Sequence, residues 1–286
     1  MLTRDAARRR GSPAFAGVLG WPLDYTLSPT IHNAAFRKLG LDWVYLAFPV
    51  PPELIGSAVA GLRSLGAMGA NVTMPHKESV IDFLDDLSGD ARAVGAVNTI
   101  QRLGDELIGR NTDIDGFGEF LLGDAGVDPA GRSAVVLGAG GAARAVIKAL
   151  GDLRASEVTI AARDEDRARP LAELAAGSRV EVTSWARAAE MASDTDIVVN
   201  ATPVGMDGRD PIPDASFGPG QVVVDLIYEP PSTPLVERAR AAGADAWGGL
   251  GMLVHQAAAS LRIWTGQDPP IETMSAAAVR AIGSHS

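Results

Sequence analysis

Cysteine is absent from this 286-residue chain, which excludes disulfide bonds, thiolate nucleophiles and metal ligation by sulfur. Histidine is scarce, with four scattered residues, so a metal site built from imidazole ligands is not expected. Long apolar runs are also missing: no stretch could span a bilayer, and the basic residues 1–10 lack the apolar run of a signal peptide. We therefore expect a cytoplasmic protein without a metal ion.

Positive charge is in the minority. The 35 acidic residues outnumber the 25 basic ones, and the formal net charge of −10 argues against nucleic acid or an anionic membrane as a partner. Hydrophobic residues make up 47% of the chain and charged residues 21%, which is typical of a globular protein. The length suits two domains. A small molecule is the expected partner, and the composition leaves monomer or homodimer open.

Lysine is rare among the basic residues, since Lys38, Lys77 and Lys148 are the only lysines among 25 Lys and Arg. Lys77 ends the segment Asn71-Val-Thr-Met-Pro-His-Lys77, in which a strand end is followed by a proline that stops regular structure. A lysine whose pKa is lowered by burial can lend a proton and take it back, whereas arginine effectively cannot. Lys77 is a candidate acid–base group, although this segment alone favours an exposed surface lysine. We assign His76 to a loop.

The N-terminal half alternates strand and helix patterns. Strands are predicted over residues 14–20, 43–49 and 66–72, and helices over 29–39 and 52–65, which indicates an α/β layer with a parallel sheet. Three polar residues near predicted element ends also have structural interpretations. Ser28 stands at an N-cap position, Asp113 is placed to cap a helix running to about residue 125, and Asn98 would be a buried amide that needs a partner.

A glycine turn follows the strand predicted over residues 133–137. Gly138-Ala-Gly-Gly-Ala-Ala143 stands between this strand and a helix, which is the context required for dinucleotide binding. Gly138 permits a tight turn, Gly140 lets the backbone approach a pyrophosphate, and Ala143 allows close packing of helix on strand. A phosphate would lie at the N-terminus of the helix.

The strand predicted over residues 157–162 indicates which nucleotide is bound. Arg163 follows it, where an acidic residue would hold the 2′-hydroxyl of NAD and an arginine accommodates the 2′-phosphate of NADP. Arg167 lies one helical turn later and could help to clamp the phosphate. Asp164 between them could orient an arginine or weaken phosphate binding. NADP is favoured, and NAD stays possible.

Further strands are predicted over residues 179–183, 196–200 and 221–225, completing a Rossmann-type unit. Tyr228 would reach the mouth of the ligand crevice, and Gln256 is a polar position on an otherwise apolar helix. We expect two α/β domains: residues 1–112, completed by C-terminal helices at about 253–286 that pack back on it, and a dinucleotide-binding domain of residues 113–252.

Seven motifs stand in an order that resembles the shikimate dehydrogenase family, and the resemblance runs from Gly20 to Gly266. They are Thr26-Leu-Ser-Pro-Thr-Ile-His-Asn33, Asn71-Val-Thr-Met-Pro-His-Lys77, Gly95-Ala-Val-Asn-Thr99, Gly109-Arg-Asn-Thr-Asp113, Gly138-Ala-Gly-Gly-Ala142, Asn200-Ala-Thr-Pro-Val-Gly-Met206 and Gly249-Leu-Gly-Met-Leu-Val-His-Gln256. The resemblance implies a two-domain oxidoreductase that interconverts 3-dehydroshikimate and shikimate with NADP(H).

The resemblance also implies a role for each matching residue. Lys77 falls on the catalytic lysine and Asp113 on its partner aspartate. The residues that fall on substrate contacts are Thr73, Asn98 and Gln256 for the ring hydroxyls, and Thr26, Ser28 and Tyr228 for the carboxylate. The predicted cofactor contacts are Gly138, Ala139, Gly140, Gly141, Ala142, Arg163, Arg167, Leu226 and Gly249.

The residue types suit this chemistry. Ketone reduction needs a proton at the oxygen, which a lysine beside a carboxylate can supply, and Asn, Gln and Thr can both donate to and accept from hydroxyls. Two positions depart from the family pattern: Thr26 stands where serine is common, and Ala162-Arg163-Asp164 where Asn-Arg-Thr is common. An NAD-preferring quinate/shikimate dehydrogenase is therefore an alternative. A non-catalytic NADP-binding redox sensor is another, but it would not need Lys77 and Asp113 together.

Overall fold

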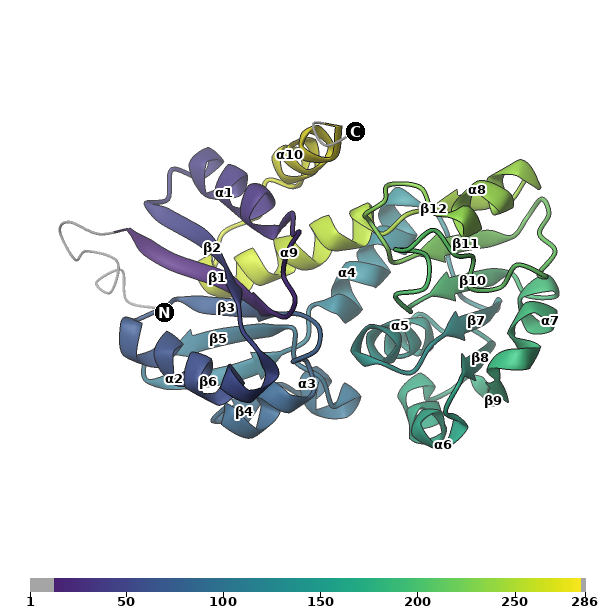
Figure 1. Ribbon diagram of the computed structural model, residues 1–286, viewed down its shortest axis with the longest axis horizontal. Coiled ribbons are helices and arrows are strands. Elements are labelled where there is room, and N and C mark those ends of the chain that lie inside the picture. Colours follow the sequence, from purple (N-terminus) through teal and green to yellow (C-terminus); the bar gives the residue numbers. More distant parts are fainter. Residues whose placement is uncertain (1–12, 284–286) are drawn as a thin grey trace. The chain divides into compact units, whose positions relative to one another are not determined.

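The computed structural model of the protein describes residues 13–283, which divide into two compact units (Figure 1). Unit 1 comprises the chain up to Arg92, Ala96–Asn111 and the chain from Ala257 onward. Unit 2 comprises Ala93–Gly95 and Thr112–Gln256. No helix within residues 13–283 is long and apolar enough to cross a membrane.

The sheet of unit 1 has six strands in the order β2-β1-β3-β5-β6-β4. The strands are β1 (Ala14–Gly20), β2 (Trp43–Pro49), β3 (Gly69–Val72), β4 (Asp86–Leu87), β5 (Thr99–Leu103) and β6 (Glu106–Arg110). β1 is parallel to β2 and to β3, as predicted. The rest is mixed, because Gly104 with φ +65° closes a tight turn between β5 and β6, and such a hairpin must be antiparallel.

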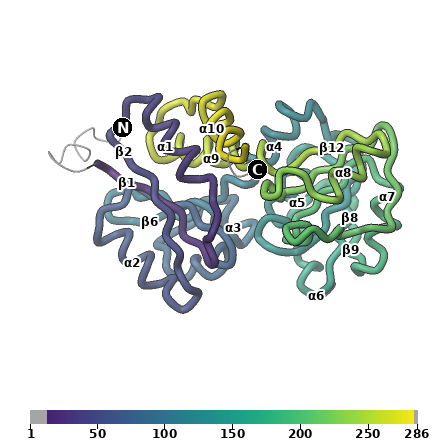
Figure 2. The backbone as a smooth tube through the Cα atoms, turned by 45° about the horizontal axis from the view of Figure 1, so that its top comes forward, coloured from purple at the N-terminus to yellow at the C-terminus, as the bar shows by residue number. Residues whose placement is uncertain are grey.

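The helices of unit 1 cover both faces of this sheet. They are α1 (Ser28–Lys38), α2 (Ile55–Leu65), α3 (Gly89–Val94), the C-terminal part of α9 (Leu250–Thr265) and α10 (Ile271–Gly283), with short 3₁₀ helices at Pro52–Leu54 and Ser79–Phe83. α10 packs against α1, as Figure 2 shows. The C-terminal helices therefore complete the unit that the first strands begin.

Unit 2 contains six parallel strands in the order β12-β11-β10-β7-β8-β9. They are β7 (Ser133–Leu137), β8 (Glu157–Ala162), β9 (Arg179–Ser184), β10 (Ile197–Asn200), β11 (Val222–Asp225) and β12 (Asp245–Trp247). The strand order reverses between β7 and β10, which is the doubly wound arrangement of dinucleotide-binding folds. Ligands of such sheets bind at this switch point, outside the carboxyl ends of the strands.

Helices lie on both faces of the sheet in unit 2. They are α4 (Asp113–Glu119), continued by a π-helical turn at Phe120–Asp124, α5 (Gly141–Asp152), α6 (Glu165–Ala168), α7 (Ala188–Ser193), α8 (Pro234–Ala241) and the start of α9. Short 3₁₀ helices at Arg169–Ala175 and Trp185–Arg187 complete the unit. α7 and α8 share one buried apolar cluster with β7, β10 and β11, and α5 packs on the opposite side (Figure 1).

Two predicted helix caps are wrong. α1 begins at Ser28 itself, and Leu27 occupies the N-cap position without a side-chain hydrogen bond. α4 likewise begins at Asp113, after Thr112. Neither Ser28 nor Asp113 therefore occupies the N-cap position of its helix.

Candidate functional site

The carboxyl ends of β1 and β3 lie side by side in unit 1, because these strands pair in parallel. The loops that follow are joined by backbone hydrogen bonds from Trp21 N to Met74 O (3.0 Å) and from Thr73 N to Leu19 O (2.9 Å). A Cβ atom added to Gly20 would lie 2.4 Å from Cγ2 of Thr73, so the glycine is required for this close approach. The predicted substrate residue Thr73 therefore stands at the edge of the sheet where ligands of parallel strands bind.

The loop after β1 places Thr26 and Ser28 at the start of α1. Oγ1 of Thr26 accepts a hydrogen bond from Ser28 N (3.3 Å), and Ser28 itself is buried. Burial raises the pKa of Tyr45 well above its usual value, and the Ser28 hydroxyl beside the phenol opposes that rise. Ser28 thus belongs to a buried polar group rather than to a helix cap.

Lys77 lies in a turn that is held from several sides. Its carbonyl oxygen accepts a hydrogen bond from Val97 N (2.7 Å). The preceding His76 is completely buried, and its Nε2 lies 2.7 Å from the carbonyl oxygen of Val50. Sequence reasoning gave His76 no role beyond a loop residue, but the structure shows that it anchors the turn bearing Lys77. The proline before His76 was the available signal, since a rigid turn needs internal anchoring.

Asn98 is 2% exposed and stands directly before β5. The sequence indicated that its buried amide needs a partner, and the structure provides the hydroxyl of Thr99, which donates to Asn98 Oδ1 (3.0 Å). The carbonyl oxygen of Asn98 accepts from Val72 N at the end of β3 (2.8 Å). Unit 1 therefore brings Thr73, Lys77 and Asn98 to one edge of its sheet.

Asp113 and Gln256 belong to two helices that touch within unit 2. A Cβ on Gly116 of α4 would lie 2.6 Å from Cβ of Gln256 on α9, so the two backbones are in direct contact. Asp113, which is 5% exposed, lies one turn before Gly116 on the same face of α4. Nε2 of Gln256 donates to Leu253 O (2.9 Å). The helix crossing thus brings these two predicted site residues close together.

The glycine turn of unit 2 has the geometry of a phosphate site. Gly138 has φ +113°. A Cβ atom added to it would lie 3.0 Å from Cγ2 of Thr202. Gly140 is the N-cap residue of α5, and an added Cβ would meet no atom within 4 Å. The space above Gly140 and the N-terminal end of α5 fit a pyrophosphate. Ala143 is fully buried against the sheet, as the turn requires.

Asp164 is the N-cap of α6, because its Oδ1 accepts a hydrogen bond from Arg167 N (3.1 Å). This carboxylate therefore has a structural task, which neither interpretation of the sequence included. Arg163, at the end of β8, and Arg167 are both exposed. β8 pairs with β7, the strand that the glycine turn follows. The two arginines come after this neighbouring strand, where their guanidinium groups fit a 2′-phosphate.

Leu226 and Gly249 come together beyond β11. A Cβ on Gly249 would lie 2.0 Å from the carbonyl oxygen of Leu226, and Gly249 N donates to Ile227 O (2.9 Å). Only glycine fits this backbone contact. Tyr228 lies half-buried in the same loop. The predicted cofactor residues Leu226 and Gly249 are thus neighbours.

Asn200 and Asp225, at the ends of β10 and β11, were not predicted as site residues. Asn200 Nδ2 donates to Asp225 Oδ1 (3.0 Å), and the Thr233 hydroxyl donates to Asp225 Oδ2 (2.7 Å). Burial raises the pKa of Asp225 to about 6, although these hydrogen bonds oppose the rise. The pair fixes the loops after both strands. A polar residue ending each apolar strand was the signal in the sequence.

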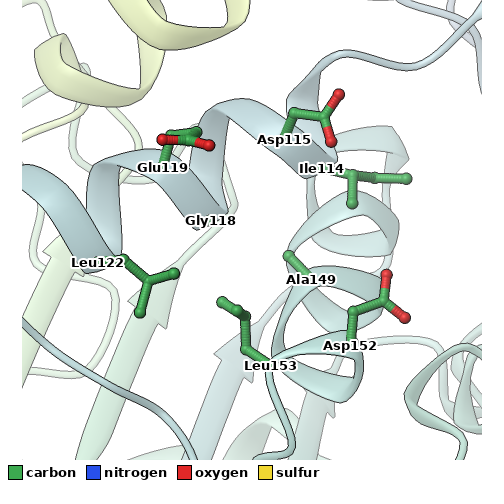
Figure 3. Close-up of a pocket in the computed structure, with 8 residues that line it drawn as sticks. All are labelled: Ile114, Asp115, Gly118, Glu119, Leu122, Ala149, Asp152 and Leu153. Atoms are coloured by element: carbon green, nitrogen blue, oxygen red, sulfur yellow. The ribbon is translucent and has the colours of Figure 1, made fainter.

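A shallow pocket lies on unit 2 between α4 with its π-helical turn and α5 (Figure 3). Leu122 and Leu153 line its apolar part, and the carboxylates of Asp115, Glu119 and Asp152 surround it. It contains none of the predicted site residues, and its acidic rim would repel a phosphate. Within residues 13–283 no cluster of His, Asp and Glu could hold a metal ion.

Family models match three parts of the chain. They describe the shikimate dehydrogenase substrate binding domain at residues 18–100, shikimate / quinate 5-dehydrogenase at residues 125–205, and the shikimate 5′-dehydrogenase C-terminal domain at residues 249–279. These matches fall in both structural units.

The chain is also similar to known proteins along most of its length. A shikimate dehydrogenase (NADP⁺) of Methanopyrus kandleri is 44% identical over 270 residues, covering 90% of this chain and 92% of the relative. A crystal structure of a shikimate dehydrogenase in complex with NADP⁺ has a TM-score of 0.86 at 37% identity, covering 94% and 96% of the two chains. A Thermus thermophilus structure in complex with NADP(H) and shikimate has a TM-score of 0.81 at 36% identity, covering 94% and 99%.

Proposed function

The chain belongs to the shikimate dehydrogenase family, and we propose that it catalyses the reversible NADP(H)-dependent interconversion of 3-dehydroshikimate and shikimate. The observation that carries the proposal is the edge of the sheet in unit 1. There, the hydrogen bonds of the Lys77 and Asn98 carbonyl oxygens hold an acid–base group beside groups that can bind hydroxyls. A protein that only binds a nucleotide has no need for this edge.

Lys77 is the proton carrier in this proposal. In the direction of reduction its ammonium group protonates the developing alkoxide, and in the reverse direction its neutral amine takes the proton from the hydroxyl. Asp113 is the partner carboxylate that orients the ammonium group. The anchoring of the turn by His76 supports this role, because a proton donor must be held at a fixed position.

The substrate contacts follow from the chemistry of the side chains. Thr73, Asn98 and Gln256 bind the ring hydroxyls, since each can both donate and accept. Thr26 and Ser28 bind the carboxylate through hydroxyl groups, with Tyr228 near the same group. Such neutral donors hold a carboxylate without adding positive charge beside Lys77.

The cofactor is NADP, held by the residues from Gly138 to Ala142, by Arg163 and Arg167, and by Leu226 and Gly249. The nicotinamide, when bound, supplies or accepts the hydride. The open space at Gly140 and the exposed arginines after β8 support this assignment. The N-cap role of Asp164 supports NADP as well, because its carboxylate is already bound to the start of α6.

Each of the two domains has its own binding function in this proposal. We assign substrate binding to residues 1–112 together with about 253–286, and dinucleotide binding to residues 113–252. The start of α4 and the first turn of α9 are the two places where the chain passes from one to the other.

The test is a kinetic matrix of shikimate and quinate against NADP and NAD, followed by the absorbance of the reduced cofactor. We expect the highest kcat/KM for shikimate with NADP. A higher value for quinate with NAD would replace the proposal by a quinate/shikimate dehydrogenase. Cofactor binding without any turnover would leave only a nucleotide-binding protein.

A further inference from the structure

A cluster of hydrogen-bonding side chains lies in the core of unit 1, beneath the edge that carries Ser28 and Asn98. Its members are Tyr45 of β2, Asn71 of β3, Thr99 of β5 and Ser260 of α9, each no more than 6% exposed. Apolar residues of the same size would fill this space without the cost of burying polar groups. The polar cluster therefore needs a reason other than packing.

Asn71 is the centre of the cluster. Its Nδ2 lies 3.0 Å from Thr99 Oγ1, 2.9 Å from Ser260 Oγ and 3.2 Å from the carbonyl oxygen of Asn98. A carbonyl oxygen can only accept, so this contact fixes which end of the amide is nitrogen. Oδ1 must then face Tyr45, and the phenol donates its proton to Oδ1 across 2.7 Å.

The cluster reaches one predicted substrate residue. Thr99 donates to Oδ1 of Asn98 (3.0 Å), which sets the orientation of that amide.

The ring of Tyr45 is itself held in place, because His32 stacks on it with a centroid distance of 4.3 Å and an interplanar angle of 6°. Burial lowers the pKa of His32 to about 3, so this ring is neutral at physiological pH and packs as an aromatic side chain.

We propose that Asn71 is a positioning residue that fixes the orientation of Asn98 through Thr99, and so sets the affinity for the substrate. This inference rests on the proposed function. A fully satisfied buried network is rigid, and rigid side chains lose less entropy when a polyhydroxylated substrate binds. Asn71 acts without touching the substrate.

Single-hydroxyl variants test the network with little change of shape. Thr99→Val removes the hydroxyl that orients Asn98, and Tyr45→Phe removes the hydroxyl that holds Oδ1 of Asn71. We expect each variant to raise the KM for shikimate about 5- to 10-fold, the value of one lost hydrogen bond, with the KM for NADP unchanged. Thr99→Ser keeps the hydroxyl and should restore the wild-type KM. Thr159→Val, at a buried position of β8 in unit 2, is the matched control.

An analogue separates a positioning role from a general loss of stability. With the shikimate analogue that lacks the ring hydroxyl bound by Asn98, the two variants and wild type should have similar KM values. With analogues that lack another ring hydroxyl, the penalty of both variants should persist. A merely structural effect would raise the KM values for every analogue alike.

The outcomes distinguish this inference from the proposed function. If wild type turns over shikimate and the variants have the same KM as wild type, the positioning role of the network is overturned and the proposed function stands. Failure of Thr99→Ser to restore the wild-type KM would lead to the same conclusion. A wild-type protein that neither binds nor oxidises shikimate would overturn the proposed function, and the substrate role of the network with it.

Discussion

Arg163 and Asp164 illustrate how far single residues could be interpreted before the structure. The arginine after β8 indicated NADP, because a guanidinium at that position can accommodate a 2′-phosphate. The effect of Asp164 could not be judged, since an aspartate there can either repel a phosphate or cap a helix. Only the hydrogen bond from Arg167 N to Asp164 Oδ1 decides for the cap.

Arg163→Ala should raise the KM for NADP about 10- to 100-fold and leave the KM for NAD nearly unchanged. The loss corresponds to one charge-assisted hydrogen bond to the 2′-phosphate, which NAD lacks. Arg169→Ala is the control, because Arg169 forms a surface ion pair with Asp166 at 3.1 Å. Equal losses for both cofactors in the Arg163 variant would show that this arginine does not contact the 2′-phosphate.

Asp225 makes the stability of the protein depend on pH. Its folded-state pKa of about 6 lies above the usual 3.8, so its contribution to stability is fully present below pH 3.8 and is lost as the pH rises through 6. Asp225→Asn should remove this loss. The free energy of unfolding of the variant relative to wild type should therefore increase by about 2–3 kcal/mol between pH 4 and pH 7.

Urea unfolding at both pH values measures this difference. The substitution is close to isosteric, and the amide oxygen can still accept from Asn200 and Ile227, which lie 3.0 Å and 3.1 Å from Oδ1. An identical pH dependence in variant and wild type would mean that the buried carboxyl group is ionised in the folded protein without cost.

At the scale of elements, the sequence predicted best those segments whose pattern has one interpretation. β7, β8 and β2 have the predicted bounds, because short apolar runs between turn residues are typical of buried strands. α8 and β12 were missed, although Thr233 caps α8 and Pro234 follows it. The antiparallel pairing of β3 with β5 could not be predicted from periodicity, which does not reveal strand direction.

Two glycines inside helices allow a test at this scale. Gly116→Ala places a Cβ 2.6 Å from Gln256 Cβ, so α4 and α9 must move apart, whereas a Cβ at Gly61 of α2 meets nothing within 4 Å. We expect Gly116→Ala to destabilise the protein by about 1–3 kcal/mol through overpacking. Gly61→Ala should stabilise it by about 0.5–1 kcal/mol through helix propensity.

Thermal and urea unfolding of the two glycine variants provide the measurement, with kcat/KM as a second reading. Gly116→Ala should also lower kcat/KM, since the crossing carries Asp113 and Gln256. A Gly116 variant as stable and active as the Gly61 variant would show that the close approach of α4 and α9 is unimportant.

At the scale of the whole molecule, the fold and the function rest on different kinds of information. A doubly wound unit with a glycine turn hosts many reactions, so it indicates a dinucleotide and no particular substrate. The prediction of the substrate rested on the polar motifs around Lys77, Asn98 and Asp113, together with the family resemblance. The residues behind the site, such as Asn71, Asp225 and His76, could not be assigned, because their roles depend on partners distant in sequence.

The most direct test of the account is the kcat of Lys77→Ala with shikimate and NADP, measured beside Lys148→Ala. Lys148 pairs with Asp152 at 2.5 Å on the surface of α5 and has no part in the proposed reaction. Loss of the proton carrier should lower kcat about 10²–10⁴-fold with little change in KM, while the Lys148 variant keeps the wild-type value. A Lys77 variant with near-native kcat would contradict the account.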